Sequence, residues 1–254
     1  MSGWLTIAGV GPGDADLITP AASRALSEAT DLIGYGPYLD RIPEIGPKQT
    51  VHASDNRVEL DRARHALALA AAGRKVAVVS GGDPGVFAMA AAVFEAVDKG
   101  EPEWRDLDIR IEPGVTAMLA AAASAGAPLG GDFCAISLSD NLKSWATIER
   151  RLKAAAEADF VIALYNPASR ARAHQIEKAF ALLRTLKGSE TVTLLVRAAG
   201  TAEAKVTITT LGEAAPQAAD MRTLIIVGSR STRLIHRPGR TPWVYTPRSE
   251  EEAT

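Results

Sequence analysis

Three short glycine-rich segments, each following an apolar run, could bind a small molecule through their backbone atoms. They are residues 9–14 (Gly-Val-Gly-Pro-Gly-Asp), 80–87 (Ser-Gly-Gly-Asp-Pro-Gly-Val-Phe) and 113–117 (Pro-Gly-Val-Thr-Ala). Because glycine carries no side chain, a ligand can lie directly against the chain at such positions. Ligands of open α/β sheets bind at the carboxyl ends of the strands, where these corners would lie. Together they predict a binding site, although each one alone could equally be a plain tight turn.

The first corner departs from a dinucleotide-binding loop. Asp14 stands where the G-x-G-x-x-G pattern needs its third glycine, and its charge would oppose a pyrophosphate. Residues 34–36 (Gly-Tyr-Gly) replace the acidic ribose ligand expected after the second strand. Both features disfavour a nucleotide-dependent oxidoreductase. In the second corner, Asp83 either offers a fixed carboxylate to a hydroxyl, an amine or a cation, or begins a helix together with Pro84.

The sequence lacks the residue patterns of several other kinds of active site. The sequence contains no G-x-x-x-x-G-K-[ST], H-E-x-x-H, G-x-S-x-G or C-x-x-C pattern. The four histidines show no ligand spacing, and the single cysteine, Cys134, rules out an intramolecular disulfide framework. We therefore expect no metal centre and a reducing compartment.

Composition and charge limit the partners. The chain of 254 residues is 47% hydrophobic and 23% charged, as is typical of a globular protein. A net charge of −2 argues against a general nucleic-acid binder. The longest uncharged stretch, residues 113–131, is rich in small side chains and predicts a buried helix rather than a membrane span. Without a visible secretion signal, we expect a cytoplasmic protein that binds neither membranes nor nucleic acid.

The elements that must position the corners alternate between strand and helix. Apolar runs and helical stripes predict strands at 4–10, 31–35, 75–80, 109–111, 160–165, 191–197, 206–210 and 223–227. Helices are predicted from Thr19-Pro20, over 57–72, after residue 114, and on the stripes that begin at Trp145 and Ile176. Residues 126–132 read as a linker. The pattern predicts an α/β protein with two α/β domains, at 1–130 and 131–245, and a frayed tail at 246–254.

The charge is distributed unevenly. Residues 1–138 carry 11 basic and 18 acidic residues, a net charge of −7, whereas residues 139–254 carry 17 and 12, a net charge of +5. Between Asp220 and Glu250 the chain is rich in arginine and has no acidic residue. Arginine pairs with carboxylates bidentately, so some of these arginines could bind an anionic substrate. The alternative is a solvated tail. The candidates are Arg230, Arg233 and Arg237.

The three corners, in this order and spacing, resemble the motifs of the tetrapyrrole (precorrin) methyltransferases over about residues 3–245. The resemblance includes residues 17–19 (Leu-Ile-Thr) after the first corner. It extends to residues 31–38 (Asp-Leu-Ile-Gly-Tyr-Gly-Pro-Tyr), 137–141 (Ser-Leu-Ser-Asp-Asn) and 164–167 (Leu-Tyr-Asn-Pro). These three segments resemble the branch that methylates precorrin-3B at C17. The resemblance implies a class III methyltransferase-like fold, an active site in the cleft between the two domains, and a homodimer.

The same resemblance implies a cofactor and the residues that bind it. S-Adenosylmethionine would be the methyl donor and S-adenosylhomocysteine the product. The residues implied for the cofactor are Pro12, Gly81, Gly82, Asp83, Val86, Thr116, Ala117 and Tyr165, with backbone atoms of Ala198 or Ala199 near adenine.

The implied substrate is a tetrapyrrole, a ring-hydroxylated lactone whose methylation at C17 accompanies contraction of the macrocycle to precorrin-4. Contraction should need a base or a hydrogen-bond donor, and the candidates are Tyr35, Asp140 and Asn166. Tyr35 is followed by Gly36 where uroporphyrinogen-type members have an acidic residue, so no base is transferred to that position. Each candidate could instead satisfy local backbone. Another precorrin or cobalt-precorrin C-methyltransferase, and a non-catalytic tetrapyrrole carrier, remain alternatives.

Overall fold

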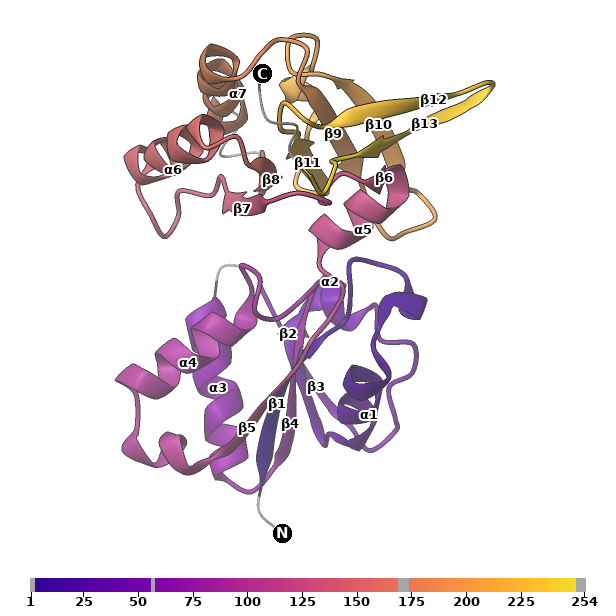
Figure 1. Ribbon diagram of the computed structural model, residues 1–254. Helices are drawn as coiled ribbons and strands as arrows, with labels where there is room; N and C mark the ends of the chain where they lie inside the picture. Colours follow the sequence, from indigo (N-terminus) through magenta and orange to yellow (C-terminus); the bar gives the residue numbers. More distant parts are fainter. Residues whose placement is uncertain (1–2, 56–57, 169–173, 250–254) are drawn as a thin grey trace. The chain divides into compact units, whose positions relative to one another are not determined.

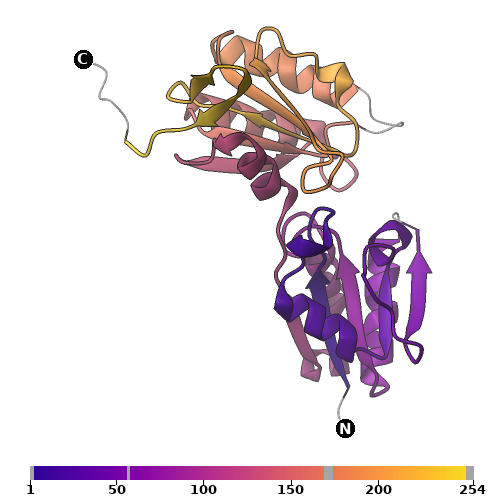
Figure 2. The same ribbon diagram turned by 90° about the vertical axis from the view of Figure 1, so that its right-hand side faces the viewer.

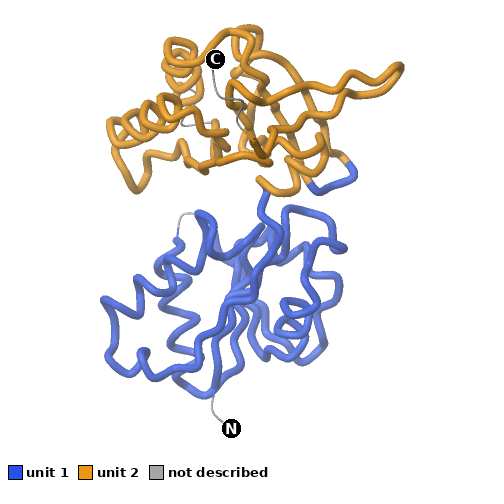
Figure 3. The backbone as a smooth tube through the Cα atoms, viewed as in Figure 1, with its two compact units in different colours: residues 1–117, 200–202 blue, residues 118–199, 203–254 orange. Residues whose placement is uncertain are grey.

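The computed structural model describes residues 3–55, 58–168 and 174–249. The chain divides into two compact units (Figure 3). The first unit comprises residues 1–117 with 200–202, and the second unit comprises residues 118–199 with 203–254. The predicted boundary lay at residue 130, but the division falls after Ala117. The helix over residues 117–125 makes its contacts mainly within the second unit.

The first unit is a parallel five-stranded sheet with helices on both faces (Figure 1). Its strand order is β3-β2-β4-β1-β5. In chain order its elements are β1 (Trp4–Gly9), the 3-10 turn η1 (Ala15–Leu17), α1 (Pro20–Glu28), β2 (Asp31–Tyr35), α2 (Gly36–Leu39), β3 (Thr50–Ser54), α3 (Glu59–Ala71), β4 (Lys75–Ser80), α4 (Met89–Lys99), η2 (Pro102–Asp106) and β5 (Asp108–Glu112).

The central strand β4 shows why the sheet needs two helical layers. Its side chains alternate, so that Val76 and Val78 pack beneath α3 and α4. Ala77 and Val79 face the other way and pack beneath α1. A strand that is buried on both faces has a continuous apolar sequence, which is the pattern that predicts β4.

Local signals confirm several predicted boundaries. The Thr19 side chain accepts a hydrogen bond from the Ala22 N–H, and Pro20 occupies the first turn of α1. Gly73, with φ +84°, directly follows α3 and its C-cap residue. The predicted strands at 31–35 and 75–80 coincide with β2 and β4. Helix α4 and strand β3 are not among the predicted elements.

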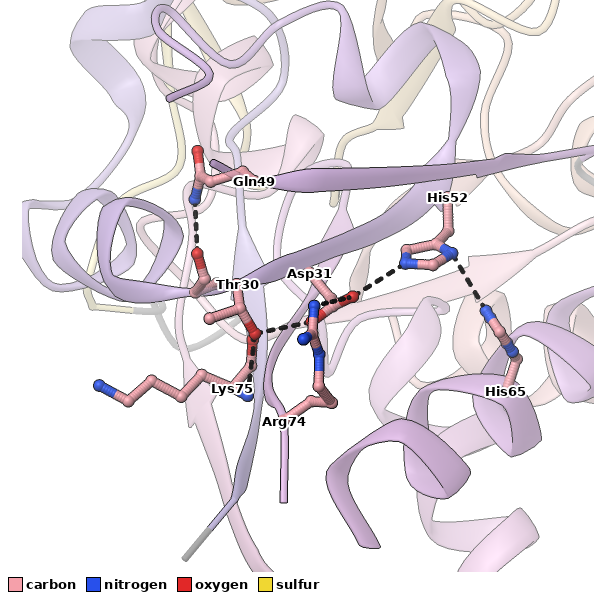
Figure 4. A network of polar contacts seen from close by, with 8 residues as sticks. Thr30, Asp31, Gln49, His52, His65, Arg74 and Lys75 are labelled. Atoms are coloured by element: carbon pink, nitrogen blue, oxygen red, sulfur yellow. Dashed lines mark hydrogen bonds and ion pairs between the residues drawn. The ribbon is translucent and has the colours of Figure 1, made fainter. Parts of the chain in front are cut away.

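A polar network joins the amino ends of β2 and β3, at the edge of the sheet opposite the glycine corners (Figure 4). The Asp31 carboxylate, only 2% exposed, accepts hydrogen bonds from Arg74, Thr30 and His52. The Arg74 Nε lies 2.8 Å from Asp31 Oδ2 and the His52 Nε2 lies 3.0 Å from Asp31 Oδ1. Burial raises the pKa of Asp31, but the hydrogen bonds from Arg74, Thr30 and His52 outweigh it and hold this pKa at about 2.

This network makes folding stability depend on pH in the acid range. The pKa of Asp31 is lower in the folded protein than the value of about 3.9 in an unfolded chain, so its contribution is present above about pH 4 and disappears toward pH 2. We expect Asp31→Asn to lower the free energy of unfolding by about 2 kcal/mol at pH 7. Urea denaturation at a series of pH values from 7 to 2 should show the free energies of unfolding of the wild type and Asp31→Asn converging. The exposed control Asp61→Asn should follow the wild type. Parallel curves for Asp31→Asn would contradict this assignment.

The second unit contains a mixed five-stranded sheet in the order β10-β9-β11-β8-β7 and a small three-stranded sheet, β12-β13-β6. Its elements are α5 (Ala117–Ala125), β6 (Gly126–Ala127), β7 (Phe133–Ser137), α6 (Trp145–Glu157), β8 (Val161–Tyr165), α7 (His174–Leu186), β9 (Val192–Arg197), β10 (Lys205–Thr210), η3 (Pro216–Ala218), β11 (Thr223–Val227), β12 (Arg233–Arg237) and β13 (Arg240–Tyr245). Helices α6 and α7 pack on one face of the large sheet, where Leu152 and Phe180 are fully buried.

Strands β7, β8 and β9 point in the same direction, because β7 is parallel to β8 while β8 and β9 are both antiparallel to β11. Ser137, Tyr165 and Arg197 therefore end at one edge of the large sheet. We call it the carboxyl edge of the second unit.

The arginine-rich end of the chain is not a solvated tail. Residues 233–245 form an antiparallel ribbon of β12 and β13 (Figure 1 and Figure 2). Thr246, at the start of the predicted tail, is buried, and its hydroxyl donates to the Pro128 carbonyl at 2.6 Å. Of that tail, residues 250–254 lie outside the described residues. None of the helices in the described ranges combines the length and the apolar character needed to cross a membrane.

Candidate active site

The first and second glycine corners are joined by backbone hydrogen bonds. The Gly82 N–H donates to the Gly11 carbonyl at 2.7 Å, and the Gly11 N–H donates to the Gly82 carbonyl at 3.2 Å. Both glycines have φ +68°, a conformation that other residues rarely adopt. The corners after β1 and β4 therefore form one connected surface at the carboxyl edge of the first sheet.

Asp83 ties the third corner to this surface. Its Oδ1 accepts a hydrogen bond from the Gly85 N–H at 2.8 Å, and its Oδ2 accepts one from the Gly114 N–H at 3.1 Å. Gly114 follows β5, so the carboxylate spans two separate corners. Asp83 therefore holds the loop backbone in place, and its contact with a ligand stays a prediction.

Close packing explains the glycines at the meeting point. A Cβ on Gly114 would lie 2.2 Å from the Gly82 carbonyl oxygen, and one on Gly9 would lie 2.7 Å from the Gly114 nitrogen. A Cβ on Gly82, in contrast, would meet nothing closer than 3.8 Å, at the Thr116 Cα. At Gly82 the positive φ, rather than close packing, therefore favours glycine.

A segment from much later in the chain closes on the first corner. The Asp14 N–H donates to the Gly200 carbonyl at 2.7 Å, and Gly200 packs so tightly on Pro12 that a Cβ there would lie 2.4 Å from the proline ring. Ala198 and Ala199 precede this segment and are both buried. The predicted position of their backbone atoms near adenine stays a prediction.

The remaining predicted cofactor residues are distributed between the two units. Val86 is half-buried in the second corner, where its N–H donates to the Asp83 carbonyl. Thr116 is buried at the third corner, and Ala117 begins α5. In the second unit the Tyr165 hydroxyl accepts a hydrogen bond from the Met118 N–H at 3.1 Å. Tyr165 therefore caps the first turn of α5, one residue after Ala117.

Tyr38, to which the sequence analysis assigned no role, lies against the second corner. The Tyr38 ring is so close to Gly81 that a Cβ there would lie 2.7 Å from it. Tyr35, a predicted catalytic residue, contacts Tyr38 edge to face at 5.3 Å between ring centres. The Arg41 guanidinium lies 4.9 Å from the Tyr38 ring centre. Burial raises the pKa of the Tyr38 hydroxyl, although Arg41 opposes this effect, so the hydroxyl is a hydrogen-bond donor at neutral pH.

The other two predicted catalytic residues lie at the carboxyl edge of the second unit. The Asn166 Nδ2 donates to the Ser137 hydroxyl at 3.0 Å, which joins the ends of β8 and β7. Asp140 follows β7, and its Oδ2 accepts a hydrogen bond from the Gln175 Nε2 at 2.9 Å. Gln175 is a residue that sequence reasoning missed, because only its pairing with Asp140 distinguishes it from other polar residues of an amphipathic helix.

Positive φ angles at residues other than glycine occur in both units, mostly after the ends of strands. Among the described residues other than glycine, four have a positive φ: Phe87, Asp159, Asn166 and Ala198. Three of them follow the ends of β4, β8 and β9, within or next to predicted ligand-binding segments. Strained conformations persist where the surrounding structure holds them, and they are frequent at ligand sites.

The three predicted substrate arginines lie elsewhere in the second unit. The Arg230 N–H donates to Asp159, which precedes β8, so Arg230 lies at the edge of the sheet opposite Tyr165 and Asn166. On the ribbon, Arg233 donates to the Arg230 carbonyl at 2.7 Å, and Arg237 stacks on Trp243 at 4.1 Å. The structure does not bring these arginines to the carboxyl edge of their own unit. Their binding of substrate carboxylates stays a prediction.

The chain is similar to known proteins along nearly its whole length. The family model of the Tetrapyrrole (Corrin/Porphyrin) Methylases matches residues 5–215. A precorrin-3B C(17)-methyltransferase of a Sinorhizobium species is 56% identical over 248 residues, 98% of this chain and 97% of that protein. The crystal structure of the methyltransferase CobJ matches with a TM-score of 0.91 at 54% identity, covering 97% of this chain and 100% of that chain. A uroporphyrin-III C-methyltransferase from Thermus thermophilus, complexed with S-adenyl homocysteine, shares the fold with a TM-score of 0.67 at 24% identity, covering 89% of this chain and 97% of that chain.

Proposed function

Because the chain belongs to the tetrapyrrole (corrin/porphyrin) methylase family, we infer that it transfers a methyl group to C17 of precorrin-3B in cobalamin biosynthesis. The observation that carries this inference is the 56% identity to a precorrin-3B C(17)-methyltransferase over almost the full length of both chains. The match of 0.91 in TM-score to the methyltransferase CobJ supports it independently of single residues.

The methyl donor in this proposal is S-adenosylmethionine, which supplies a methyl group on a sulfonium when it is bound. The first unit supports such a ligand, because Gly81 and Gly82 have no side chains to cover their backbone and the hydrogen bonds that Asp83 accepts join the second and third corners. The rigid corners contribute alignment, which is the main requirement of an in-line methyl transfer. Aligned reacting groups can gain an effective molarity of about 10⁵ M or more.

Contraction of the macrocycle to precorrin-4 is the finer part of the proposal. It requires a group that removes a proton and a group that donates a hydrogen bond to the lactone. Asp140 is the candidate acceptor of the proton, and Asn166 and Tyr35 are the candidate donors. Asp140 and Asn166 follow neighbouring parallel strands of the same sheet, which supports a shared task.

Replacing the residue that serves contraction should separate the two chemical steps. We expect one of Tyr35→Phe, Asp140→Ala and Asn166→Ala to release a C17-methylated tetrapyrrole whose ring is not contracted. Carbon NMR distinguishes this product from precorrin-4, whereas mass alone does not, since the two are isomers. Loss of both steps in parallel in all three variants would remove these residues from contraction.

Incubation with precorrin-3B and methyl-¹³C-labelled S-adenosylmethionine tests the proposed function directly. We expect the label at C17, located by NMR, and no transfer when the labelled donor is omitted. A parallel reaction with the cobalt-bearing substrate decides between the metal-free and the cobalt form. Label at another carbon would assign the chain to a different precorrin methylation, and substrate binding without transfer would indicate a carrier. The same samples, measured by light scattering, test the further proposal that the protein is a homodimer.

A further inference from the structure

Gln175 and Asp140 form a pair that connects two elements of the second unit. Gln175 is the second residue of α7, and its Nε2 donates to Asp140 Oδ2 at 2.9 Å in the loop after β7. A carboxylate can only accept hydrogen bonds, so the amide must turn its N–H₂ group toward Asp140. The orientation of the Gln175 amide is therefore dictated by Asp140.

With this orientation, the other end of the amide has no partner among the residues that the structure describes. The Gln175 Oε1 is buried and accepts no hydrogen bond from any residue that the structure describes. A buried acceptor without a partner is unfavourable and occurs rarely in proteins. A glutamine that served only packing could be replaced by an apolar side chain at no such penalty. The hydrogen bond to Asp140 is thus the contact that this residue maintains.

The position of the pair relates it to the site. Asp140 and Gln175 lie at the carboxyl edge of the second unit, where Asn166 joins β8 to β7 through Ser137. The Asn166 amide thus fixes the Ser137 side chain at the end of β7, and the Gln175 amide fixes the Asp140 side chain in the loop after β7. The Oδ1 of Asp140 accepts no hydrogen bond from the residues within the described ranges and is left for another group.

We propose that Gln175 is a positioning residue that acts through Asp140. Its N–H₂ group holds the Asp140 carboxylate in one orientation, so that the second oxygen can take a proton from an O–H or N–H group of the tetrapyrrole. In that step the substrate O–H or N–H bond breaks, a new O–H bond forms on Asp140, and the electron pair stays on the substrate. The role rests on the proposed function, which supplies the substrate whose proton is removed.

A glutamine suits this task better than a charged residue. Once Oδ1 of Asp140 carries the proton, Oδ2 becomes a carbonyl-type oxygen that still accepts the hydrogen bond from the Gln175 Nε2. Gln175 can therefore hydrogen-bond Asp140 both before and after the proton transfer, whereas a methionine of similar size can do neither.

The test combines variants of both residues. We expect Gln175→Met to lower kcat for formation of precorrin-4 by about 10-fold or more, with KM and S-adenosylhomocysteine affinity within twofold of the wild type. Gln175→Glu keeps the shape but has no N–H to donate, so it should be at least as defective. In an Asp140→Ala background, Gln175→Met should change kcat by less than twofold, because the contact is already lost. Gln217→Met, at an exposed position on η3 in the same unit, is the matched control and should leave all these values unchanged.

Two results would overturn the proposal. The first is full activity of Gln175→Met. The second is a loss of kcat on Gln175→Met that is equally large in the wild-type and the Asp140→Ala backgrounds. Failure of the wild type to methylate precorrin-3B would instead overturn the proposed function. The pair can then be tested without turnover, because the side-chain N–H₂ resonances of Gln175 should shift in Asp140→Ala and not in the exposed control Asp61→Ala. Resonances that are the same in Asp140→Ala and the wild type would show that the contact is absent in solution.

Discussion

Replacing Asp83 with alanine is expected to weaken the binding of S-adenosylhomocysteine by roughly 10- to 150-fold, corresponding to about 1.5–3 kcal/mol for a hydrogen bond to a charged group. The physical reason is the position of its two oxygens. One accepts the Gly85 N–H and the other accepts the Gly114 N–H, so the carboxylate joins the second corner to the third. Without it, two backbone N–H groups lose their partner, and the surface that receives the ligand is no longer held in one shape.

A graded series makes this prediction sharper. Asp83→Asn has one acceptor oxygen and can satisfy only one of the two N–H groups, so calorimetry should give an affinity between those of the wild type and Asp83→Ala. We expect the melting temperature of both variants to fall as well, since the bonds are internal to the fold. Asp61→Ala, on an exposed position of α3 in the same unit, is the control. Wild-type affinity in Asp83→Ala would show that the corners keep their shape without the carboxylate.

Replacing Asp159 with alanine is expected to lower the free energy of unfolding by about 1.5–3 kcal/mol, the range for a hydrogen bond to a charged group, because the Asp159 side chain is 30% exposed and the ion pair is only partly buried. The Lys187 side chain is only 2% exposed, and its Nζ lies 2.7 Å from Asp159 Oδ1. The same carboxylate accepts the Arg230 N–H at 3.0 Å. Asp159 therefore joins the end of α7 to the start of β8 and to the loop after β11, and its loss leaves a buried ammonium group without a counter-ion.

Three further variants separate the ion pair from the backbone at this position. Asp159 has φ +56°, which alanine tolerates poorly and glycine accepts, so Asp159→Gly isolates the loss of the charge. Asp159→Asn should be intermediate, because its amide oxygen can still accept from Lys187. The double variant Asp159→Gly/Lys187→Met should recover much of the stability, since no buried charge remains unpaired. Urea denaturation that finds Asp159→Gly as stable as the wild type would show that the pair contributes nothing.

Signals between near neighbours in the chain determined most of the elements of this protein. A continuous apolar run specified β4, and the Thr19 cap before Pro20 specified the start of α1. The glycine corners could be located because a positive φ or a close backbone approach is a local requirement, as at Gly11 and Gly82. For the same reason the resemblance to the family, which depends on these corners, could be recognised from the order and spacing of residue types alone.

The tertiary structure decided which corners meet and which side chains pair. Asp83 contacts Gly114 only because β4 and β5 both flank β1 in the sheet, and Gly200 reaches Asp14 only because the chain returns to the first unit. The sequence also could not show that Gln175 faces Asp140, or that the arginine-rich end forms a ribbon away from the carboxyl edge of its unit. Strand order and register depend on the packing of the whole sheet, and no local pattern of residue types encodes them.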